Sequence, residues 1–169
     1  MIDEFVYVEG KKYRRGYTSG SCACGASKAA LRLLLENRPI NKVRIGTPKG
    51  IDLDLVVENI SWGQDWAQCS IRKDGGDDID ATHGMDIFAR LDLVEPDQVP
   101  DFRSDLDSDY LFITSGQGIG RVTKKGLDIG IGRPAINRVP LGMILKEVQE
   151  TIDELGLDIY DYLAGRRIL

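Results

Sequence analysis

Apolar residues recur along the chain with two different periods, and these periods separate helical from extended stretches. Between residues 22 and 37, four alanines are followed by four leucines, with Ser19 or Ser21 available as a cap and a proline just beyond. This pattern predicts a helix whose small-residue face can approach a sheet closely. A second helix is predicted over residues 140–155, where leucine, isoleucine and valine return every three or four positions and Gly156 follows.

Between the two predicted helices, apolar and polar residues alternate, which is typical of half-buried β-strands. We expect strands at residues 43–45, 51–57, 66–71 and 87–94. Residues 95–109 hold two prolines and six acidic side chains, which indicates a connection and a candidate subdomain boundary. The whole pattern predicts an α+β fold, with a mostly antiparallel sheet of five or six strands and two main helices. In the last strand the side chains expected to face the core are Ile87, Ala89, Leu91 and Leu93.

Composition and charge narrow the class of protein. The chain has 169 residues, of which 42% are apolar and 29% charged, so it can form a globular core and is not disordered. The net charge of −5 argues against a general nucleic-acid-binding protein. No apolar run could span a membrane and the first residues do not resemble a signal peptide, so we expect a cytoplasmic protein. Three cysteines, two of them one residue apart, match neither a disulfide framework nor a zinc site.

Residues 73–84, between two predicted strands, concentrate four carboxylates and the one histidine of the chain. Three glycines in this stretch let the backbone turn tightly and bring the polar side chains together. Loops held by rigid strands often carry chemistry, so this loop supplies the candidate catalytic residues. The alternative is a solvated acidic turn in which the carboxylates cap backbone groups. The candidates are Asp77, Asp78, Asp80 and His83, with Asp74 beside them.

Four basic residues lie just before the first predicted helix, and hydroxyl side chains begin it. The free backbone N–H groups and positive dipole end of a helix suit a carboxylate or a phosphate. Plain capping of the helix is the alternative and requires no ligand. The residues concerned are Lys11, Lys12, Arg14 and Arg15, followed by Thr18, Ser19 and Ser21.

A second glycine-rich stretch, Gly116, Gly118 and Gly120, follows a short apolar run. Taken alone it suggests a Rossmann-type nucleotide turn, but that fingerprint requires a helix directly afterwards. Residues 121–134 instead hold three more glycines and a proline. The glycines can still bring backbone against a flat or bulky ligand, with Arg121 and Arg133 supplying positive charge. The alternative is a glycine-rich hairpin with a solvated basic edge.

Together these stretches resemble the signature blocks of the CbiD family. The blocks are residues 14–28, 73–84, and 116–123 continuing through 132–140, in the same order as in the family. The family comprises the cobalt-precorrin-5B C-1 methyltransferases of anaerobic cobalamin biosynthesis. The resemblance therefore implies transfer of a methyl group from S-adenosylmethionine to C-1 of a cobalt-bearing corrin precursor.

Members of the family continue past the third block into a second glycine-rich half, and nothing after Gly156 resembles that half. We therefore expect residues 1–156 to correspond to the family's N-terminal domain, with 157–169 as a tail or the start of a missing second half. The chain is then either the first part of a longer enzyme or a shortened relative, and a site built between two halves would be incomplete in it.

The resemblance also implies roles for the candidate residues. A carboxylate could lie near the sulfonium charge of the donor, and His83 could move a ring proton at neutral pH. Two alternatives remain: a non-catalytic module that binds an anionic tetrapyrrole, and a divalent-metal-binding protein, although the spacing fits no calcium loop. S-adenosylmethionine would be held by Thr18, Ser19, Ser21, Gly116, Gly118 and Gly120, and the substrate by Arg14, Arg15, Lys73, Arg121 and Arg133, with no resident metal.

Overall fold

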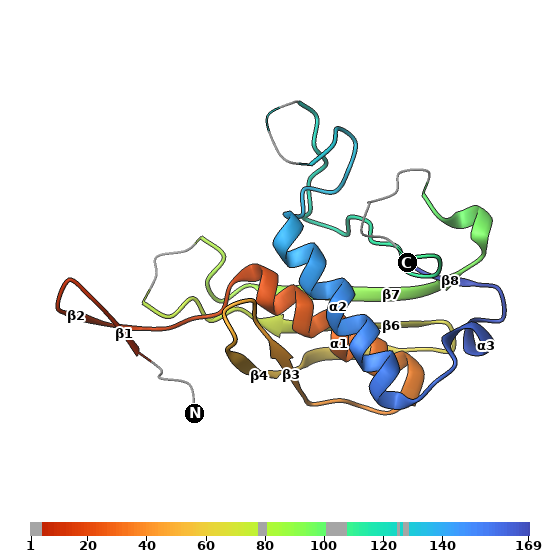
Figure 1. Ribbon diagram of the computed structural model, residues 1–169, viewed down its shortest axis with the longest axis horizontal. Helices are drawn as coiled ribbons and strands as arrows, with labels where there is room; N and C mark the ends of the chain where they lie inside the picture. The colour runs from red at the N-terminus through yellow and green to blue at the C-terminus, as the bar shows by residue number, and fades with distance from the viewer. Residues whose placement is uncertain (1–4, 78–80, 101–107, 125, 127–128) are drawn as a thin grey trace.

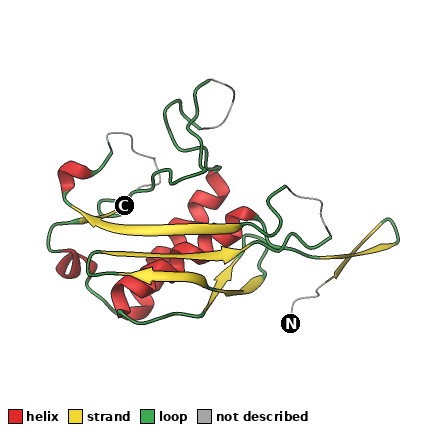
Figure 2. Ribbon diagram, turned by 180° about the vertical axis from the view of Figure 1, so that it is seen from behind, coloured by secondary structure: helices red, strands yellow, loops and turns green. Residues whose placement is uncertain are grey.

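A computed structural model describes residues 5–77, 81–100, 108–124, 126 and 129–169. Two long helices, α1 (Ser19–Glu36) and α2 (Arg138–Leu155), lie side by side over one face of antiparallel strands (Figure 1). Seen from behind, the strands lie in front of these helices (Figure 2). The structure confirms the predicted α+β class.

In the described part of the chain, eight strands form three antiparallel sheets. A four-stranded sheet has the order β5-β6-β7-β8. Strands β3 and β4 form a pair close to it, whereas β1 and β2 form a hairpin that projects away from it (Figure 1). The four predicted strands correspond to β3, β4, β6 and β7. The remaining elements are a single 3₁₀ turn and a short helix, α3. The bounds are β1 Phe5–Val8, β2 Lys11–Arg14, β3 Lys42–Gly46, β4 Asp52–Val56, β5 Glu58–Trp62, β6 Trp66–Arg72, β7 Asp86–Val94, the 3₁₀ turn Pro96–Gln98, α3 Ile159–Leu163 and β8 Arg167–Ile168.

Helix α1 begins earlier than predicted and uses a different cap. Thr18 is the N-cap residue, and its hydroxyl accepts a hydrogen bond from the backbone N–H of Ser21 at 3.0 Å. The prediction of Ser19 or Ser21 as the cap was therefore wrong, because both residues lie inside the helix. The predicted close approach to the sheet is confirmed at Gly25, where an added Cβ would lie 2.5 Å from a methyl carbon of Leu55.

Helix α2 runs beside α1 and begins at the same end of the fold. It starts two residues before the predicted Pro140 and ends, as predicted, at Gly156 with a left-handed φ of 62°. A Cβ added to Gly20 in the first turn of α1 would lie 2.8 Å from the ring of Pro140. Farther along, the ammonium of Lys28 donates a hydrogen bond to Glu147 at 2.9 Å. The first turns of the two helices are therefore neighbours.

The last residues of the chain belong to the main sheet. Residues 157–169, in which the sequence shows no clear pattern, form α3 and β8. Ile168 is fully buried and pairs with Leu93 of β7, and a parallel bridge joins it to Leu111. The chain thus returns to this sheet edge after the connection at 95–109, of which residues 101–107 lie outside the described part. No described helix has the length and apolar character needed to cross a membrane.

Candidate functional site

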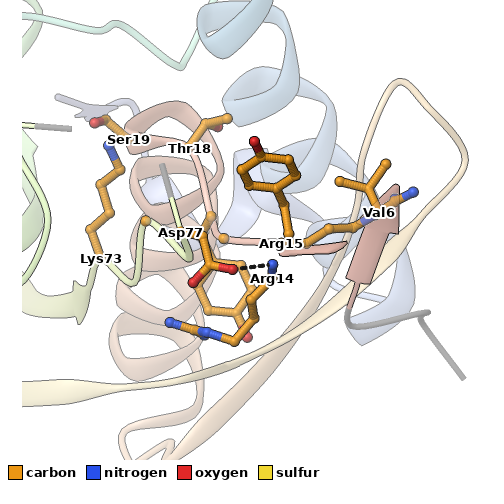
Figure 3. Close-up of a pocket in the computed structure, with 11 residues that line it drawn as sticks. Val6, Arg14, Arg15, Thr18, Ser19, Lys73 and Asp77 are labelled. Atoms are coloured by element: carbon orange, nitrogen blue, oxygen red, sulfur yellow. Dashed lines mark hydrogen bonds between the residues drawn. The ribbon is translucent and has the colours of Figure 1, made fainter. Parts of the chain in front are cut away.

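A cavity of about 520 Å³ lies between the β1-β2 hairpin, the start of α1 and the acidic loop that follows β6 (Figure 3). Two stretches that are about sixty residues apart in the sequence, 14–19 and 73–77, meet there. Its volume is in the usual range of small-molecule sites. The residues that line it are Val6, Tyr13, Arg14, Arg15, Gly16, Tyr17, Thr18, Ser19, Lys73, Gly75 and Asp77.

Two backbone segments, residues 14–17 and 74–77, are in direct contact beside the cavity. A Cβ added to Gly16 would lie 2.1 Å from the carbonyl carbon of Gly75, and one added to Gly76 would lie 2.3 Å from the carbonyl oxygen of Arg14. Hydrogen bonds join the same segments, from the N–H of Tyr17 to the Asp74 carbonyl at 2.6 Å and from the N–H of Asp77 to the Arg14 carbonyl at 3.1 Å. Glycine is required here because any side chain would separate the two segments.

An ion pair fastens the acidic loop to the end of β2. Both guanidinium nitrogens of Arg14 donate to the carboxylate of Asp74, at 2.5 and 2.7 Å. This pairing, together with a hydrogen bond from the N–H of Gly76, lowers the pKa of Asp74 to about 2. The backbone N–H of Arg14 donates to Asp77 at 2.6 Å, as Figure 3 shows. The guanidinium group of Arg14, which was predicted to bind the substrate, is therefore already paired with the carboxylate of Asp74 in the acidic loop.

Lys73, also predicted to bind the substrate, is buried and hydrogen-bonded to another residue of the protein. Its side chain is only 3% exposed, and its ammonium donates a hydrogen bond to the hydroxyl of Thr82 at 2.6 Å. That hydroxyl lies 3.3 Å from the hydroxyl of Ser19 in the first turn of α1. The backbone of Lys73 closes the loop through hydrogen bonds with Gly84 and Met85. Lys73 thus brings a buried positive charge to the junction of the loop and the helix.

His83 is exposed, and its Nδ1 accepts a hydrogen bond from the backbone N–H of Gly75 at 3.0 Å. This bond leaves the proton of the neutral ring on Nε2. Nε2–H can therefore donate a hydrogen bond, whereas accepting a proton at Nδ1 would require breaking the bond to Gly75. In this geometry the ring positions the backbone beside the cavity.

The other candidates near the cavity differ in their surroundings. Thr18 and Ser19 line it, whereas Ser21 is buried, with its hydroxyl 2.9 Å from that of Thr18. Arg15 is exposed and makes no hydrogen bond or ion pair with any described residue. It is therefore a cation at the cavity that can meet an anionic ligand. The candidates Asp78 and Asp80 lie outside the described residues.

The second glycine-rich stretch lies at the start of α2 and does not line the cavity. Gly120 accepts a hydrogen bond from the N–H of Ala135 at 2.8 Å, and a guanidinium nitrogen of Arg121 donates to the carbonyl of Gly132 at 3.0 Å. These bonds form an irregular hairpin, and no helix appears in the described part of 121–137. Gly116, Gly118, Arg121 and Arg133 therefore belong to a surface separate from the cavity.

Five of the eleven residues that line the cavity were not predicted as site residues, namely Val6, Tyr13, Gly16, Tyr17 and Gly75. Val6 and Tyr13 face each other across the β1-β2 hairpin, which turns at Glu9 and Gly10 with φ values of 50° and 78°. Two consecutive positive φ values are typical of a two-residue hairpin turn. The run of aromatic and β-branched residues at 5–8, directly before Glu9 and Gly10, is the signal that could have revealed this hairpin.

The three cysteines are buried, free thiols. Burial raises the pKa of Cys22 to about 11 and the pKa values of Cys24 and Cys69 to about 12, because a thiolate is poorly solvated there. They are therefore protonated core residues at neutral pH. Among the residues that the structure describes, no three His, Cys, Asp or Glu side chains are grouped to hold a metal ion.

The model of the CbiD family matches residues 6–161. The chain belongs to the CbiD family. A cobalt-precorrin-5B C(1)-methyltransferase of Clostridioides difficile (strain 630) is 48% identical, over 90% of this chain and 41% of that protein. The enzyme of the same name from Thermoanaerobacter sp. (strain X514) is 44% identical, over 90% of this chain and 38% of that protein. The chain spans about two fifths of the length of these curated relatives.

A solved CbiD structure has the same fold. The 1.9 Å crystal structure of the cobalamin biosynthesis protein CbiD from Archaeoglobus fulgidus matches with a TM-score of 0.58 and 21% identity. The match covers 97% of this chain and 53% of the other. At this identity the likeness supports the fold alone. In the present structure the first block (14–28) contains the start of α1, the second (73–84) contains the acidic loop, and the third (116–123 and 132–140) contains the irregular hairpin and the start of α2.

Proposed function

We propose that this CbiD chain forms the donor-binding part of an S-adenosylmethionine-dependent methyltransferase acting at C-1 of cobalt-precorrin-5B. The observation that carries the proposal is the cavity in which the first two family blocks meet, at residues 14–19 and 73–77. Membership of the family and the activity named for its curated relatives support the reaction. The substrate is the one in the names of those relatives, and S-adenosylmethionine as the methyl donor is part of the proposal.

The groups around the cavity fit the parts of S-adenosylmethionine. The rings of Tyr13 and Tyr17 offer apolar faces to an adenine base. The start of α1, capped by Thr18, has no acidic residue in its first turn and offers N–H groups to the methionine carboxylate. Asp77 adds a carboxylate that is compatible with the sulfonium charge. Arg15 remains available for a carboxylate of the substrate.

When bound, S-adenosylmethionine supplies an electrophilic methyl group carried on a sulfonium. The chain's own contribution is alignment, because a transfer of this kind depends on placing the reacting atoms in line. Contacts between Gly16 and Gly75 fix the loop against the helix start. His83 holds that loop through Gly75, so in this proposal it is a positioning residue and transfers no proton in the reaction.

Calorimetric titration with S-adenosylhomocysteine, the product form of the donor, tests the proposal. We expect micromolar binding to the wild-type chain. In a parallel titration with S-adenosylmethionine, Asp77→Asn should bind at least about tenfold more weakly than wild type, because the lost contact with the sulfonium charge is worth about 1.5–3 kcal/mol. Its affinity for S-adenosylhomocysteine, whose sulfur is uncharged, should change little. Asp65→Asn is the matched control, since Asp65 pairs with Arg166 at the opposite end of β6. Absence of binding to the folded wild-type chain would refute the donor site and favour a module that binds only the tetrapyrrole.

A further inference from the structure

Three glycines at one end of the fold have no local structural reason to be glycine. Gly116, Gly120 and Gly142 all have φ outside the left-handed region. A Cβ added to any of them would meet no described atom within 4 Å. By contrast, Gly16 and Gly25 are crowded by neighbouring atoms. The fold described here would accept alanine at the first three positions.

Gly142 is the most informative of the three, because it lies inside helix α2. Glycine lowers helix stability relative to alanine, since its unfolded backbone has more freedom to lose. The same absence of a side chain lets a flat molecule approach the helix backbone. A close-approaching ligand would therefore account for a residue that the helix alone disfavours.

The three glycines belong to adjoining segments. The hydrogen bond from Ala135 to Gly120 holds the irregular hairpin two residues before Asn137, the N-cap of α2. We call residues 116–121 together with 138–142 the loop-helix face; it lies where the hairpin joins the start of α2 (Figure 1). The contact between Gly20 and Pro140 joins this face to the start of α1, and hence to the rim of the cavity.

The side chains of this region combine exposed apolar groups with positive charge. Ile119 is 45% exposed and Val139 is 63% exposed. Residues 110–140 contain five lysines and arginines and one aspartate, a local charge of +4 in a chain whose net charge is −5. Such a surface complements a flat, apolar molecule with several carboxylates at its edge. The five basic residues of this stretch are Arg121, Lys124, Lys125, Arg133 and Arg138, of which Lys125 lies outside the described residues.

We propose that the loop-helix face binds the macrocycle of the corrin precursor, with Gly116, Gly120 and Gly142 against the ring and Ile119 and Val139 beside it. This inference rests on the proposed methyltransferase function and identifies where its substrate binds. Arg121, Arg133 and Arg138 meet the carboxylates at the edge of the ring. The substrate face and the donor cavity are then neighbours across the contact between the two helix starts.

The test is an absorbance titration of the chain with cobyrinic acid, a cobalt corrinoid with free carboxylates. Wild type is compared with Gly116→Ala and Gly142→Ala, and the melting temperature of each variant is measured. We expect melting temperatures equal to or above wild type and affinity at least about tenfold weaker, because an added methyl overpacks a fitted contact. Gly46→Ala is the control, since its added Cβ would make only ordinary contacts at 3.9 Å.

Three outcomes would overturn the inference: equal affinity in all variants, equal weakening in Gly46→Ala, or no binding of cobyrinic acid to wild type. Titration of the same samples with S-adenosylhomocysteine separates this failure from failure of the proposed function. Donor binding without corrinoid binding would leave the donor cavity standing and remove the loop-helix face as the substrate site.

Discussion

Replacement of Glu147 should destabilise the fold more than any surface substitution, because this carboxylate joins three elements in the interior. One oxygen accepts a hydrogen bond from Lys28 of α1 at 2.9 Å, and the other accepts from the N–H of Gly46 on β3 at 2.9 Å. The side chains of Lys28 and Glu147 are 11% and 4% exposed. Glu147→Ala would leave the buried ammonium of Lys28 and the partly buried N–H of Gly46 without this acceptor.

The expected loss is about 3–5 kcal/mol in the free energy of unfolding, the usual effect of removing one partner of a buried ion pair. Urea denaturation followed by tryptophan fluorescence measures it. With an m-value of about 2 kcal/mol per M, the midpoint should fall by about 1.5–2.5 M. The double variant Lys28→Met/Glu147→Gln removes both charges but keeps an oxygen for Gly46, so its loss should be below about 2 kcal/mol.

Lys146→Ala is the matched control for this experiment. It breaks an ion pair with Glu150 on the same helix, in which the two side chains are 63% and 46% exposed. Its effect should be below about 0.5 kcal/mol. A loss under about 1 kcal/mol in Glu147→Ala, or a double variant no more stable than the single one, would refute the reasoning.

Three further predictions concern single groups. Thr18→Ala removes the cap of α1 and should lower the free energy of unfolding by about 1 kcal/mol in urea denaturation. The Asp74 carboxyl, followed by carbon NMR, should titrate near pH 2, and Arg14→Ala should move its pKa back toward the ordinary 3.8. Because the folded pKa is lowered, the stabilisation from this carboxylate is complete above pH 3.8 and is lost as the pH falls toward 2. A thiol reagent at pH 8 should modify the cysteines only after unfolding, since burial raises the pKa of Cys22, Cys24 and Cys69.

Each of these has a result that contradicts it. Thr18→Ser should keep the stability of wild type, so equal losses in the serine and alanine variants would exclude the hydroxyl as the cause. A carboxyl that titrates at its ordinary pKa in wild type would mean that the Arg14 pair does not form in solution. Rapid labelling of the native chain would show that the thiols are not buried.

The two long helices, α1 and α2, and the four predicted strands were recoverable from sequence because their apolar residues follow a local period, whereas α3 was not predicted. Strand β5 was not, since Asn59 has a positive φ of 50° and the register shifts between Glu58 and Ser61, which breaks the alternation. Strand β8 has two residues and exists because Ile168 pairs with a distant strand. The cap of α1 was misplaced because Thr18, Ser19 and Ser21 can all cap a helix, and backbone geometry decides among them.

For the candidate site, residue type and spacing identified the acidic loop and the residues before α1. Their meeting in one cavity depends on a backbone contact between Gly16 and Gly75 that no local pattern reveals. The same is true of the partners that engage candidate groups, such as Asp74 for Arg14 and Gly75 for His83. Sequence therefore located the groups, while long-range contacts determine which of them remain available to a ligand.

The donor cavity is the central claim, and amide chemical shifts test it most directly. A ¹⁵N-labelled sample of the chain would be titrated with S-adenosylhomocysteine and its backbone amide signals followed. The account predicts saturable shifts concentrated at residues 15–19 and 75–77, which line or adjoin the cavity. Shifts confined to the second glycine-rich stretch at 116–121, or no shifts at millimolar ligand, would contradict it.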